Sequence, residues 1–483
     1  MTRPHLLAQM FLMFSLLLAA SLPAVEWPTW RGPFGNGSAQ DCDRPLLSDL
    51  SKAKRLWKSE DTIMSSWGYP KKQSWLGFAS PVISDGRVFV FLPEGDGERI
   101  DPKRKVKVEE MRNKIGALKF LTDELIAKVS CIDVDDVVYC LDAKTGKTLW
   151  RRSWPKRAMN CWTENGAGHH TMCAADGMAF ASGTAGHVYC LDAKTGEVRW
   201  EHRPFAGLKG VKKMEADWAK AKETGSIPAR GVGSPDFCAA PAYADGVVIF
   251  GGGSSLIAYD AKSGAELWRQ SNVLGKFGSP LVWRSSGQGK DSFITAGSKI
   301  QAWEPRTGKA LWQVEGASAN CTPAIDGNRL VTREKDGPIC YKMSATGAEK
   351  VWQWDKKPVG CTNSPVIHHG RVYAIVGKPR GEDAGFWWVC VDLNSGKELS
   401  LVKNASKPWS SAIASNGLLF ISPHNSVSRK ICVIEIDETE NKLTRIKDTP
   451  FPVDGCNSVA FSIVDGLLYT RGLDGIYCHD LRR

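Results

Sequence analysis

Apolar and polar residues alternate along most of this chain in short runs that end at turn residues. The clearest phrase runs from Val138 to Trp150, and close copies lie at Val188–Trp200, Leu256–Trp268 and Lys299–Trp312. Each copy has an apolar run, a turn that ends in Thr-Gly or Ser-Gly, and a second run closed by Trp. This pattern predicts a β-hairpin, because glycine supplies the positive φ that such a turn requires.

A weaker phrase precedes each hairpin and supplies two more strands. It has a small residue, often followed by Pro, and then an apolar run through Asp-Gly or a similar turn, as at 80–90, 240–249 and 364–373. Four strands per unit are typical of a propeller blade. We therefore predict an all-β fold, an eight-bladed β-propeller of four-stranded antiparallel blades that forms one domain over residues 25–483. The copies centre near residues 142, 192, 260, 304, 343, 392, 435 and 480.

The last copy ends at Asp480, before its outermost strand, whereas Lys54–Ser59 is an isolated strand pattern that contains Trp57. We predict that this N-terminal strand closes the last blade and so removes two exposed sheet edges. The alternative is an unclosed stack of hairpins. For the Trp residues that end outer strands, we favour burial between blades over contact with a ligand.

Two insertions, 102–130 and 205–230, have the apolar spacing of helices. One lies between a second and a third strand and the other before an innermost strand, so both should emerge on the same side of the ring. They could form a lid or docking surface over the channel mouth. Packing of each helix against a blade is an equal alternative.

Residues 1–24 have the pattern of a signal peptide, with Arg3 before an apolar stretch and small residues near Ala24. We expect a periplasmic or secreted protein, monomeric, with no transmembrane span once this segment is removed. An uncleaved anchor is the alternative. The formal net charge is +11, but neither basic segment resembles a nucleic-acid module, so we expect no nucleic-acid partner.

The chain has 14 cysteines, and most recur at one position of the third strand. Third strands of adjacent blades are too far apart for disulfides, so these cysteines should be buried thiols. Cys321 and Cys361 lie nearer the axis, where a disulfide is sterically possible. The pairs His169-His170 and His368-His369 should point to opposite faces of a strand. We therefore predict no metal site.

The phrase Tyr-x-x-Asp-Ala-x-Thr-Gly-x-x-x-Trp resembles the tryptophan-docking repeat of the pyrroloquinoline quinone (PQQ) propellers. That superfamily includes quinoprotein alcohol dehydrogenases and the propeller lipoprotein of the outer-membrane barrel-assembly machinery. The segment Trp27–Ser38 also looks like the opening of exported bacterial members. The resemblance implies the fold and places any chemistry at the mouth of the central channel. The chain looks closer to the non-catalytic barrel-assembly branch.

The catalytic branch uses a disulfide between adjacent cysteines, and this sequence has no Cys-Cys pair. That branch also binds calcium through a Glu and an Asn and uses an Asp as base. Glu164, Asn165 and Asp236 are of these types, but no local motif matches, so we assign no catalytic residue.

The loops that lead into the innermost strands, here called lead-in loops, are rich in Asn, Trp and Gly. They predict either a polar rim with aromatic walls that binds a small ligand, or side chains that satisfy backbone groups in tight loops. The binding candidates are Trp75, Trp162, Glu164, Asn165, Asp236, Lys276, Asn320, Asn363, Trp409 and Asn457.

Our leading expectation is a non-enzymatic scaffold of the bacterial cell envelope that binds a protein or polymer and needs no cofactor. The alternative is a PQQ-dependent quinoprotein oxidoreductase, with calcium, that acts on an alcohol or a sugar.

Overall fold

The fold is taken from a computed structural model. The structure describes residues 26–64, 79–114, 121–160, 171–228, 239–275, 278–285, 290–315, 321–334, 337–356, 363–378, 385–404, 412–421, 430–445, 449–450, 461–472 and 474–483.

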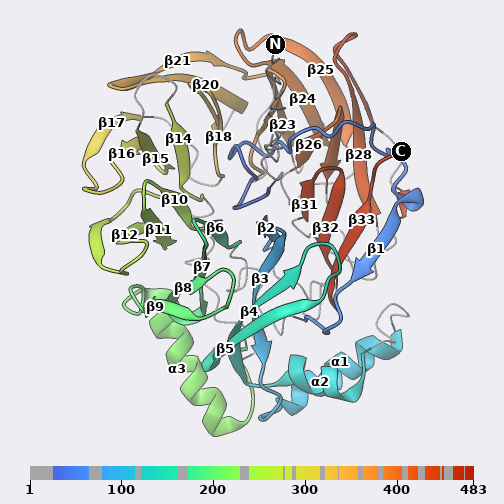
Figure 1. Ribbon diagram of the computed structural model, residues 1–483, viewed down its shortest axis with the longest axis vertical. Helices are drawn as coiled ribbons and strands as arrows, with labels where there is room; N and C mark the ends of the chain where they lie inside the picture. Colours follow the sequence, from blue (N-terminus) through green and yellow to red (C-terminus); the bar gives the residue numbers. More distant parts are fainter. Residues whose placement is uncertain are drawn as a thin grey trace, which may run out of the picture.

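Eight antiparallel sheets are arranged around one axis, which confirms the predicted eight-bladed propeller (Figure 1). Blade 1 contains β2 (Val82–Ser84), β3 (Arg87–Gly95), β4 (Asp133–Asp142) and β5 (Thr148–Met159), from the axis outwards. Blade 2 contains β6 (Cys173–Ala175), β7 (Met178–Ser182), β8 (Val188–Asp192) and β9 (Val198–His202). Blade 3 contains β10 (Ala242–Ala244), β11 (Val247–Gly252), β12 (Ser255–Asp260) and β13 (Glu266–Gln270). Blade 4 contains β14 (Leu281–Arg284), β15 (Asp291–Ala296), β16 (Lys299–Trp303) and β17 (Ala310–Glu315).

The second half of the ring repeats this order. Blade 5 contains β18 (Ala324–Asp326), β19 (Arg329–Glu334), β20 (Gly337–Ser344) and β21 (Gly347–Gln353). Blade 6 contains β22 (Val366–His368), β23 (Arg371–Lys378), β24 (Gly385–Asp392) and β25 (Glu398–Asn404). Blade 7 contains β26 (Ile413–Ser415), β27 (Leu418–Ile421), β28 (Lys430–Asp437) and β29 (Lys442–Arg445), and β30 (Thr449–Pro450) also pairs with β28. Blade 8 contains β31 (Phe461–Val464), β32 (Leu467–Arg471) and β33 (Ile476–Asp480).

The N-terminal strand β1 (Lys54–Lys58) is the outermost strand of blade 8, as predicted. It pairs with β33 in antiparallel register, with Lys54 opposite Asp480 and Trp57 opposite Cys478. The chain reaches β1 through the 3-10 turn η1 (Leu50–Lys52), whose Leu50 is fully buried. Closure therefore joins the two ends of the chain in one sheet.

The spacing from the turn glycine to the tryptophan is the same in each clear copy of the repeat, because the two residues make contacts between neighbouring blades. Trp200 donates its indole N–H to the Ala261 carbonyl of the next blade at 2.9 Å. A Cβ built on Gly264, whose φ is +71°, would lie 2.6 Å from the Trp200 ring. The glycine therefore provides both the turn and the flat surface on which the tryptophan packs. Trp57, Trp150, Trp268 and Trp352 make the same two contacts with Ala143 and Gly146, Ala193 and Gly196, Pro305 and Gly308, and Leu393 and Gly396.

The hydrophobic core lies between the faces of adjacent blades. Phe180 and Cys190 of blade 2 pack with Phe250 and Tyr259 of blade 3 in one buried cluster. The described cysteines are free thiols, and each of them except Cys42 is buried. The expectation of buried thiols is confirmed for these residues. Cys321 is also free, which argues against a disulfide with Cys361, a residue outside the described ones.

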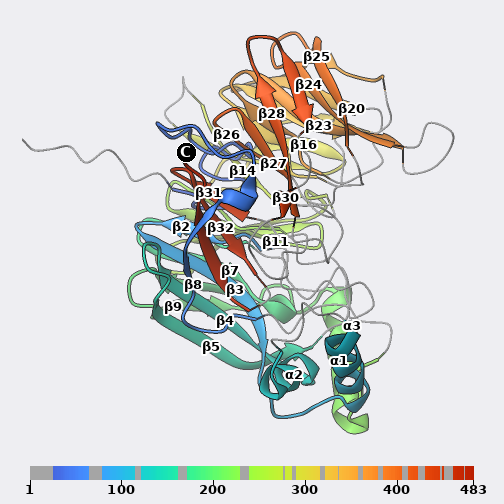
Figure 2. The same ribbon diagram turned by 90° about the vertical axis from the view of Figure 1, so that its right-hand side faces the viewer.

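The ring has two sides, which we name by their connections. Turns between first and second strands, and between third and fourth strands, lie on the turn side. The other connections, including the lead-in loops, lie on the loop side. The insertions form three helices on the loop side: α1 (Pro102–Lys114), α2 (Asp123–Ser130) and α3 (Lys209–Thr224). Figure 2 shows α1 and α3 on one side of the ring and the N-terminal segment on the opposite side.

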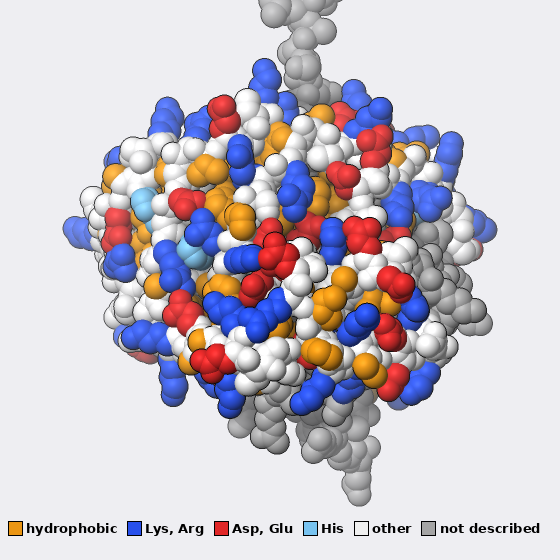
Figure 3. All heavy atoms as spheres, turned by 90° about the horizontal axis from the view of Figure 1, so that it is seen from below, with side chains coloured by type: hydrophobic (Ala, Val, Ile, Leu, Met, Phe, Trp, Pro, Cys, Tyr) orange, Lys and Arg blue, Asp and Glu red, His pale blue; other side chains and the backbone are white. Residues whose placement is uncertain are grey.

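The three helices pack at the periphery of blades 1 and 2, so they do not form the lid that was one alternative (Figure 1). The indole of Trp218 in α3 donates to the Asp133 carboxylate of β4 at 2.6 Å. Met214 and Ala221 of α3 are buried in a cluster with Val134 of β4. On the face of the molecule seen in Figure 3, where the helices lie, positively and negatively charged side chains are interspersed. Ion pairs such as Lys213–Asp217, 2.8 Å apart, account for part of this mixture. None of the helices described is long and apolar enough to span a membrane.

Candidate functional site

Hydroxyl groups link the innermost strands of neighbouring blades near the axis. The Ser279 backbone N–H donates to Thr322 Oγ1 of the next blade at 3.0 Å, and the Thr322 N–H donates to Ser364 Oγ at the same distance. Ser80 donates to Thr171, and Ala240 donates to Ser279, in the same way. These six residues occupy the small-residue position of the weaker sequence phrase, and all of them except Thr171 precede Pro. The phrase therefore encodes a contact between blades near the axis.

The N-terminal segment 26–39 crosses the channel from blade 1 to blade 7 and passes close to these hydroxyl contacts. Trp27 forms an antiparallel bridge with Ile83 of blade 1, and the Pro28 carbonyl accepts from the Ala174 N–H of blade 2 at 2.8 Å. The Trp30 indole donates to Thr322 Oγ1 of blade 5 at 3.4 Å. Further along, Ser38 bridges Ala414 of blade 7 in parallel register. The protein thus fills part of its own channel.

Arg31 is fully buried within this crossing segment. One of its terminal nitrogens donates to the Pro365 carbonyl of blade 6, while Nε and Nη1 have no hydrogen-bond partner. Burial lowers the pKa of Arg31 to about 9, and the nearby Cys321 opposes that shift. A buried guanidinium with unsatisfied donors is costly and favours an anion nearby.

Two more buried arginines occupy matching positions on the loop side, at the ends of second strands. Arg333 in β19 donates to the backbone carbonyls of Asn363 and Ile375 in blade 6. Arg471 in β32 is fully buried, and none of its three guanidinium nitrogens has a partner. Burial lowers the pKa of Arg471 to about 10. The axial region is therefore rich in buried positive charge on its loop side.

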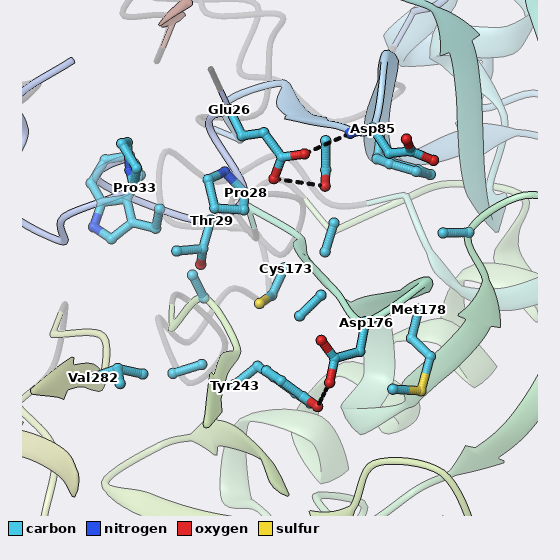
Figure 4. Close-up of a pocket in the computed structure, with 18 of the residues that line it drawn as sticks. Glu26, Pro28, Thr29, Pro33, Asp85, Cys173, Asp176, Met178, Tyr243 and Val282 are labelled. Atoms are coloured by element: carbon cyan, nitrogen blue, oxygen red, sulfur yellow. Dashed lines mark hydrogen bonds between the residues drawn. The ribbon is translucent and has the colours of Figure 1, made fainter. Parts of the chain in front are cut away.

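On the turn side, a pocket of about 800 Å³ lies between the crossing segment and blades 1 to 4 (Figure 4). Its apolar wall includes Pro33, Met178, Val282 and Phe34, and the Phe34 side chain is half exposed. Its charged groups balance, with four acids and four bases. They are Glu26, Asp85, Asp176, Asp192, Arg87, Lys194, Arg199 and Arg284.

Each acid of this pocket already accepts a hydrogen bond from a protein group. Glu26 accepts from the Asp85 N–H at 2.9 Å, and Asp176 accepts from the Tyr243 hydroxyl (Figure 4). The Asp85 carboxylate pairs with Arg87 at 2.6 Å. A hydrogen bond from Arg199 to Asp192 lowers the pKa of that carboxyl to about 2.

The pocket thiol is also unsuited to chemistry, because burial raises the pKa of Cys173 to about 12. Balanced charge, bound acids and an exposed aromatic ring suit the binding of a polypeptide segment better than proton transfer.

Asn363 is the one predicted rim residue that falls within the described chain. It lies just before β22, it is buried, and its carbonyl accepts from Arg333. The other nine candidates lie outside the described residues: Trp75, Trp162, Glu164, Asn165, Asp236, Lys276, Asn320, Trp409 and Asn457. Their grouping into a rim therefore stays a prediction.

The fit of PQQ and calcium can be tested on the described loop-side residues alone. Arg333 and Arg471 suit a polyanionic group such as the carboxylates of PQQ, whereas their positive charges oppose a calcium ion beside them. Glu164 and Asn165, which are of the residue types that bind calcium in the catalytic branch, lie outside the described residues. When bound, PQQ supplies a two-electron acceptor, and these arginines would serve to bind and orient its anionic groups.

A family model described as outer membrane protein assembly factor BamB matches residues 134–276 and 252–364. These ranges include the four clearest copies of the docking phrase. Over these residues the chain matches the repeat of the PQQ-type β-propellers. This propeller shares 35% identity over 82 residues with the serine/threonine-protein kinase AfsK of Streptomyces coelicolor, which is 16% of this chain and 9% of the kinase. It thus matches a small part of that relative's length.

Solved structures share the propeller fold at low sequence identity. Quinohemoprotein alcohol dehydrogenase from Comamonas testosteroni is 14% identical, with a TM-score of 0.55, over 96% of this chain and 81% of the dehydrogenase. BamB from Moraxella catarrhalis is also 14% identical, with a TM-score of 0.47, over 71% of this chain and 88% of BamB. At such an identity the likeness to the dehydrogenase shows the fold and leaves the function of this propeller open.

Sequence reasoning missed the three buried arginines and the turn-side pocket. Arg333 and Arg471 follow a Thr at equivalent positions of second strands, where an apolar residue is the rule, so a charged residue there was a usable signal. The pocket had no such signal, because it forms only when segment 26–39 crosses the axis.

Proposed function

We propose that this PQQ-type propeller is exported to the bacterial cell envelope, as a periplasmic or secreted protein, and acts there as a binding scaffold. The observation that carries the proposal is the turn-side pocket, whose acids are bound, whose thiol is unreactive and whose aromatic residue Phe34 is half exposed. Such a surface can hold a segment of a protein partner without performing chemistry on it.

Two further observations support this proposal. The crossing segment, through Trp30 and Arg31, takes up channel space that a cofactor or a substrate path could otherwise use. The match to the BamB family model, together with the signal-peptide pattern of residues 1–24, favours the envelope and a protein partner.

The second candidate function is a PQQ-dependent oxidoreductase that acts on an alcohol or a sugar. Arg471 favours it, because a fully buried guanidinium without partners is what an anionic cofactor would neutralise. On this reading, Arg333 and Arg471 hold the cofactor at the loop side.

Two experiments separate these functions, and the first tests the pocket as a binding surface. A photo-crosslinking side chain is placed at Phe34, in the pocket, and at Leu401, an exposed apolar position on the outer strand β25, as the matched control. In cells of the producing bacterium, we expect a discrete covalent adduct from position 34 and none from position 401. Identical adduct patterns at both positions would remove the pocket as the binding surface.

The second experiment uses the purified mature protein mixed with PQQ and Ca²⁺. We expect no PQQ absorbance to co-elute with the protein and no dye-linked oxidation of alcohols or sugars. Co-elution together with dye reduction, both lost in Arg471→Met, would establish the oxidoreductase and refute the scaffold as the main function.

A further inference from the structure

Two histidines and an aspartate meet on the turn side of blade 6, away from the pocket described above. His368 ends β22, His369 begins the turn into β23, and Asp41 follows the segment that crosses the channel. One ligand atom from each of the three residues lies within 4.8 Å of the other two. Far-separated parts of the chain thus bring nitrogen and oxygen donors together.

The two rings lie on the same side because His369 has left the strand conformation. Its φ is +47°, and its ring stacks on that of His368, with centroids 3.9 Å apart and planes 19° apart. The expectation that this pair points to opposite faces is wrong. It assumed extended backbone at both residues, whereas His369 and Gly370 form the turn between β22 and β23.

The Nδ1 atom of each ring already has a partner. His368 Nδ1 lies 2.6 Å from Ser38 Oγ, so the ring is held by a hydrogen bond to this hydroxyl. His369 Nδ1 lies 2.8 Å from a Glu438 carboxylate oxygen, which can only accept. Both contacts fix the orientation of each ring and leave Nε2 as the nitrogen available to a metal.

Both Nε2 atoms face the carboxylate of Asp41. The Nε2 of His369 lies 3.1 Å from one Asp41 oxygen, and the Nε2 of His368 lies 3.7 Å from the other. A positive charge between the nitrogen and the oxygen, either a metal ion or a proton, is what brings these atoms so close. Two ligands of a tetrahedral zinc ion, each about 2.0–2.1 Å from the metal, are about 3.3–3.4 Å apart. The observed separations bracket that value.

Burial and anchoring make the cluster a formed site rather than a chance meeting of surface groups. The His368 side chain is 3% exposed, and its Nε2 has no hydrogen-bond partner. The backbone N–H of Asn416 in blade 7 donates to Asp41 at 2.6 Å and holds the carboxylate in place.

We propose that Asp41, His368 and His369 bind one divalent metal ion of the zinc type. Imidazole nitrogens with a carboxylate suit Zn²⁺ and its transition-metal neighbours better than Ca²⁺ or Mg²⁺, which take oxygen ligands. Ser38 and Glu438 are positioning residues that orient the rings. Asp41 and His369 are partly exposed, so a water molecule can reach a fourth coordination position.

Such an ion would connect three parts of the molecule. Asp41 belongs to the N-terminal segment, the two histidines to blade 6, and Glu438, the partner of His369, to the turn after β28 of blade 7. The metal would therefore fasten the segment that crosses the channel to the ring, and binding to the folded state would raise the melting temperature.

Titration of the mature protein, purified without a histidine tag and stripped of metal, tests the proposal. We expect Zn²⁺ to bind with one equivalent by calorimetry, and Co²⁺ to give the visible absorption bands of a tetrahedral site. His369→Gln should lower the Zn²⁺ affinity at least 100-fold, and Glu438→Gln should lower it about 10–100-fold. His202→Gln, in the outer strand of blade 2, is the matched control and should bind like the wild type.

Each other outcome decides against the site. Equal Zn²⁺ affinity in wild type and His369→Gln would show adventitious binding elsewhere on the surface. Failure of folded wild-type protein to bind either ion below millimolar concentration would show that a proton, not a metal, bridges Asp41 and His369. Unchanged far-ultraviolet circular dichroism in both variants is the check that a lost affinity is not a lost fold.

Discussion

The tryptophan that ends an outer strand contributes in two separable ways, through ring burial and through its indole N–H. Trp268 uses both, since it packs on Gly308 and donates to the Pro305 carbonyl at 2.7 Å. Trp312 is buried to a similar extent, but its N–H has no partner. The reason is local: blade 5 replaces the longer Asp-Ala-x-Thr-Gly turn with a tight hairpin between Ser344 and Gly347.

This difference gives a matched pair of substitutions. Trp268→Phe should lower the free energy of unfolding by about 1 kcal/mol more than the ring change alone, because it leaves a buried carbonyl without its donor. Trp312→Phe removes an N–H that is buried without a partner, so it should cost only as much as the ring change. Trp268→Ala should cost about 3–5 kcal/mol through the cavity it creates. Urea denaturation measures all three, and equal losses for the two Phe variants would contradict the role of the hydrogen bond.

At the scale of elements, residues 26–59 have two structural roles. Strand β1 covers the edge of β33, and the crossing segment 26–39 contacts the innermost strands of several blades. Between these two parts, short contacts such as the bridge between Leu46 and Arg482 hold the chain to the end of blade 8. Removing both parts exposes an apolar sheet edge and takes away the segment that crosses the channel.

Deletion through Ser59 should therefore cause aggregation or a large loss of thermal stability. A chain that begins at Glu26 keeps both contributions and is the control, with an expected melting temperature equal to that of the mature protein. Size-exclusion chromatography and calorimetry measure the outcome. A monomeric deletion variant with an unchanged melting temperature would show that neither β1 nor the crossing segment matters for stability.

The elements could be predicted from sequence to different degrees, for reasons that are local or non-local. The turn and its docking contact depend on Asp142, Gly146 and Trp150, which lie within nine residues of sequence. The blades and their number could therefore be predicted from the sequence. The path of 26–39 depends on contacts with residues some three hundred positions away, such as Pro365, and no periodic pattern reports it. The backbone conformation of His369 likewise depends on the turn between β22 and β23. The alternation of apolar residues in these strands did not show at which residue the turn begins.

The candidate site was less predictable than the fold for the same reason. The expected rim relied on residue types in loops, and Asn363, its one described member, serves as a backbone acceptor for Arg333. This contact involves the backbone of Asn363, so it tests neither the binding rim nor the alternative that loop side chains satisfy backbone groups. The turn-side pocket arises from segments that meet only in the folded ring.

For the molecule as a whole, histidine burial sets the expected response to acid. Burial lowers the pKa of His187 to about 3 and that of His479 to about 4. Between these values and the ordinary pKa of about 6.5, the unfolded chain binds more protons than the folded one. Their contribution to stability is complete above about pH 6.5 and is lost as the pH falls towards 4.

Burial of Asp136 acts in the opposite sense, since it raises the pKa of that carboxyl to about 6 and offsets part of this loss as the pH falls below that value. The net expectation is a lower urea midpoint at pH 5 than at pH 7. His187→Gln should weaken this pH dependence. A midpoint that stays constant from pH 8 to pH 5, in wild type and variant alike, would contradict the assignment.

The closure of the ring also has a consequence in time. Ser59 accepts the backbone N–H of Ile476 through its side chain, a contact between positions 417 residues apart. During synthesis, and during any passage through an export channel, the first segment is free long before its partner strand exists. Seven blades can form in order from local hairpins, but the eighth has to wait for both ends. The slowest and most chaperone-dependent stage should thus be the last one, when an early-emerging strand finds a late-emerging edge.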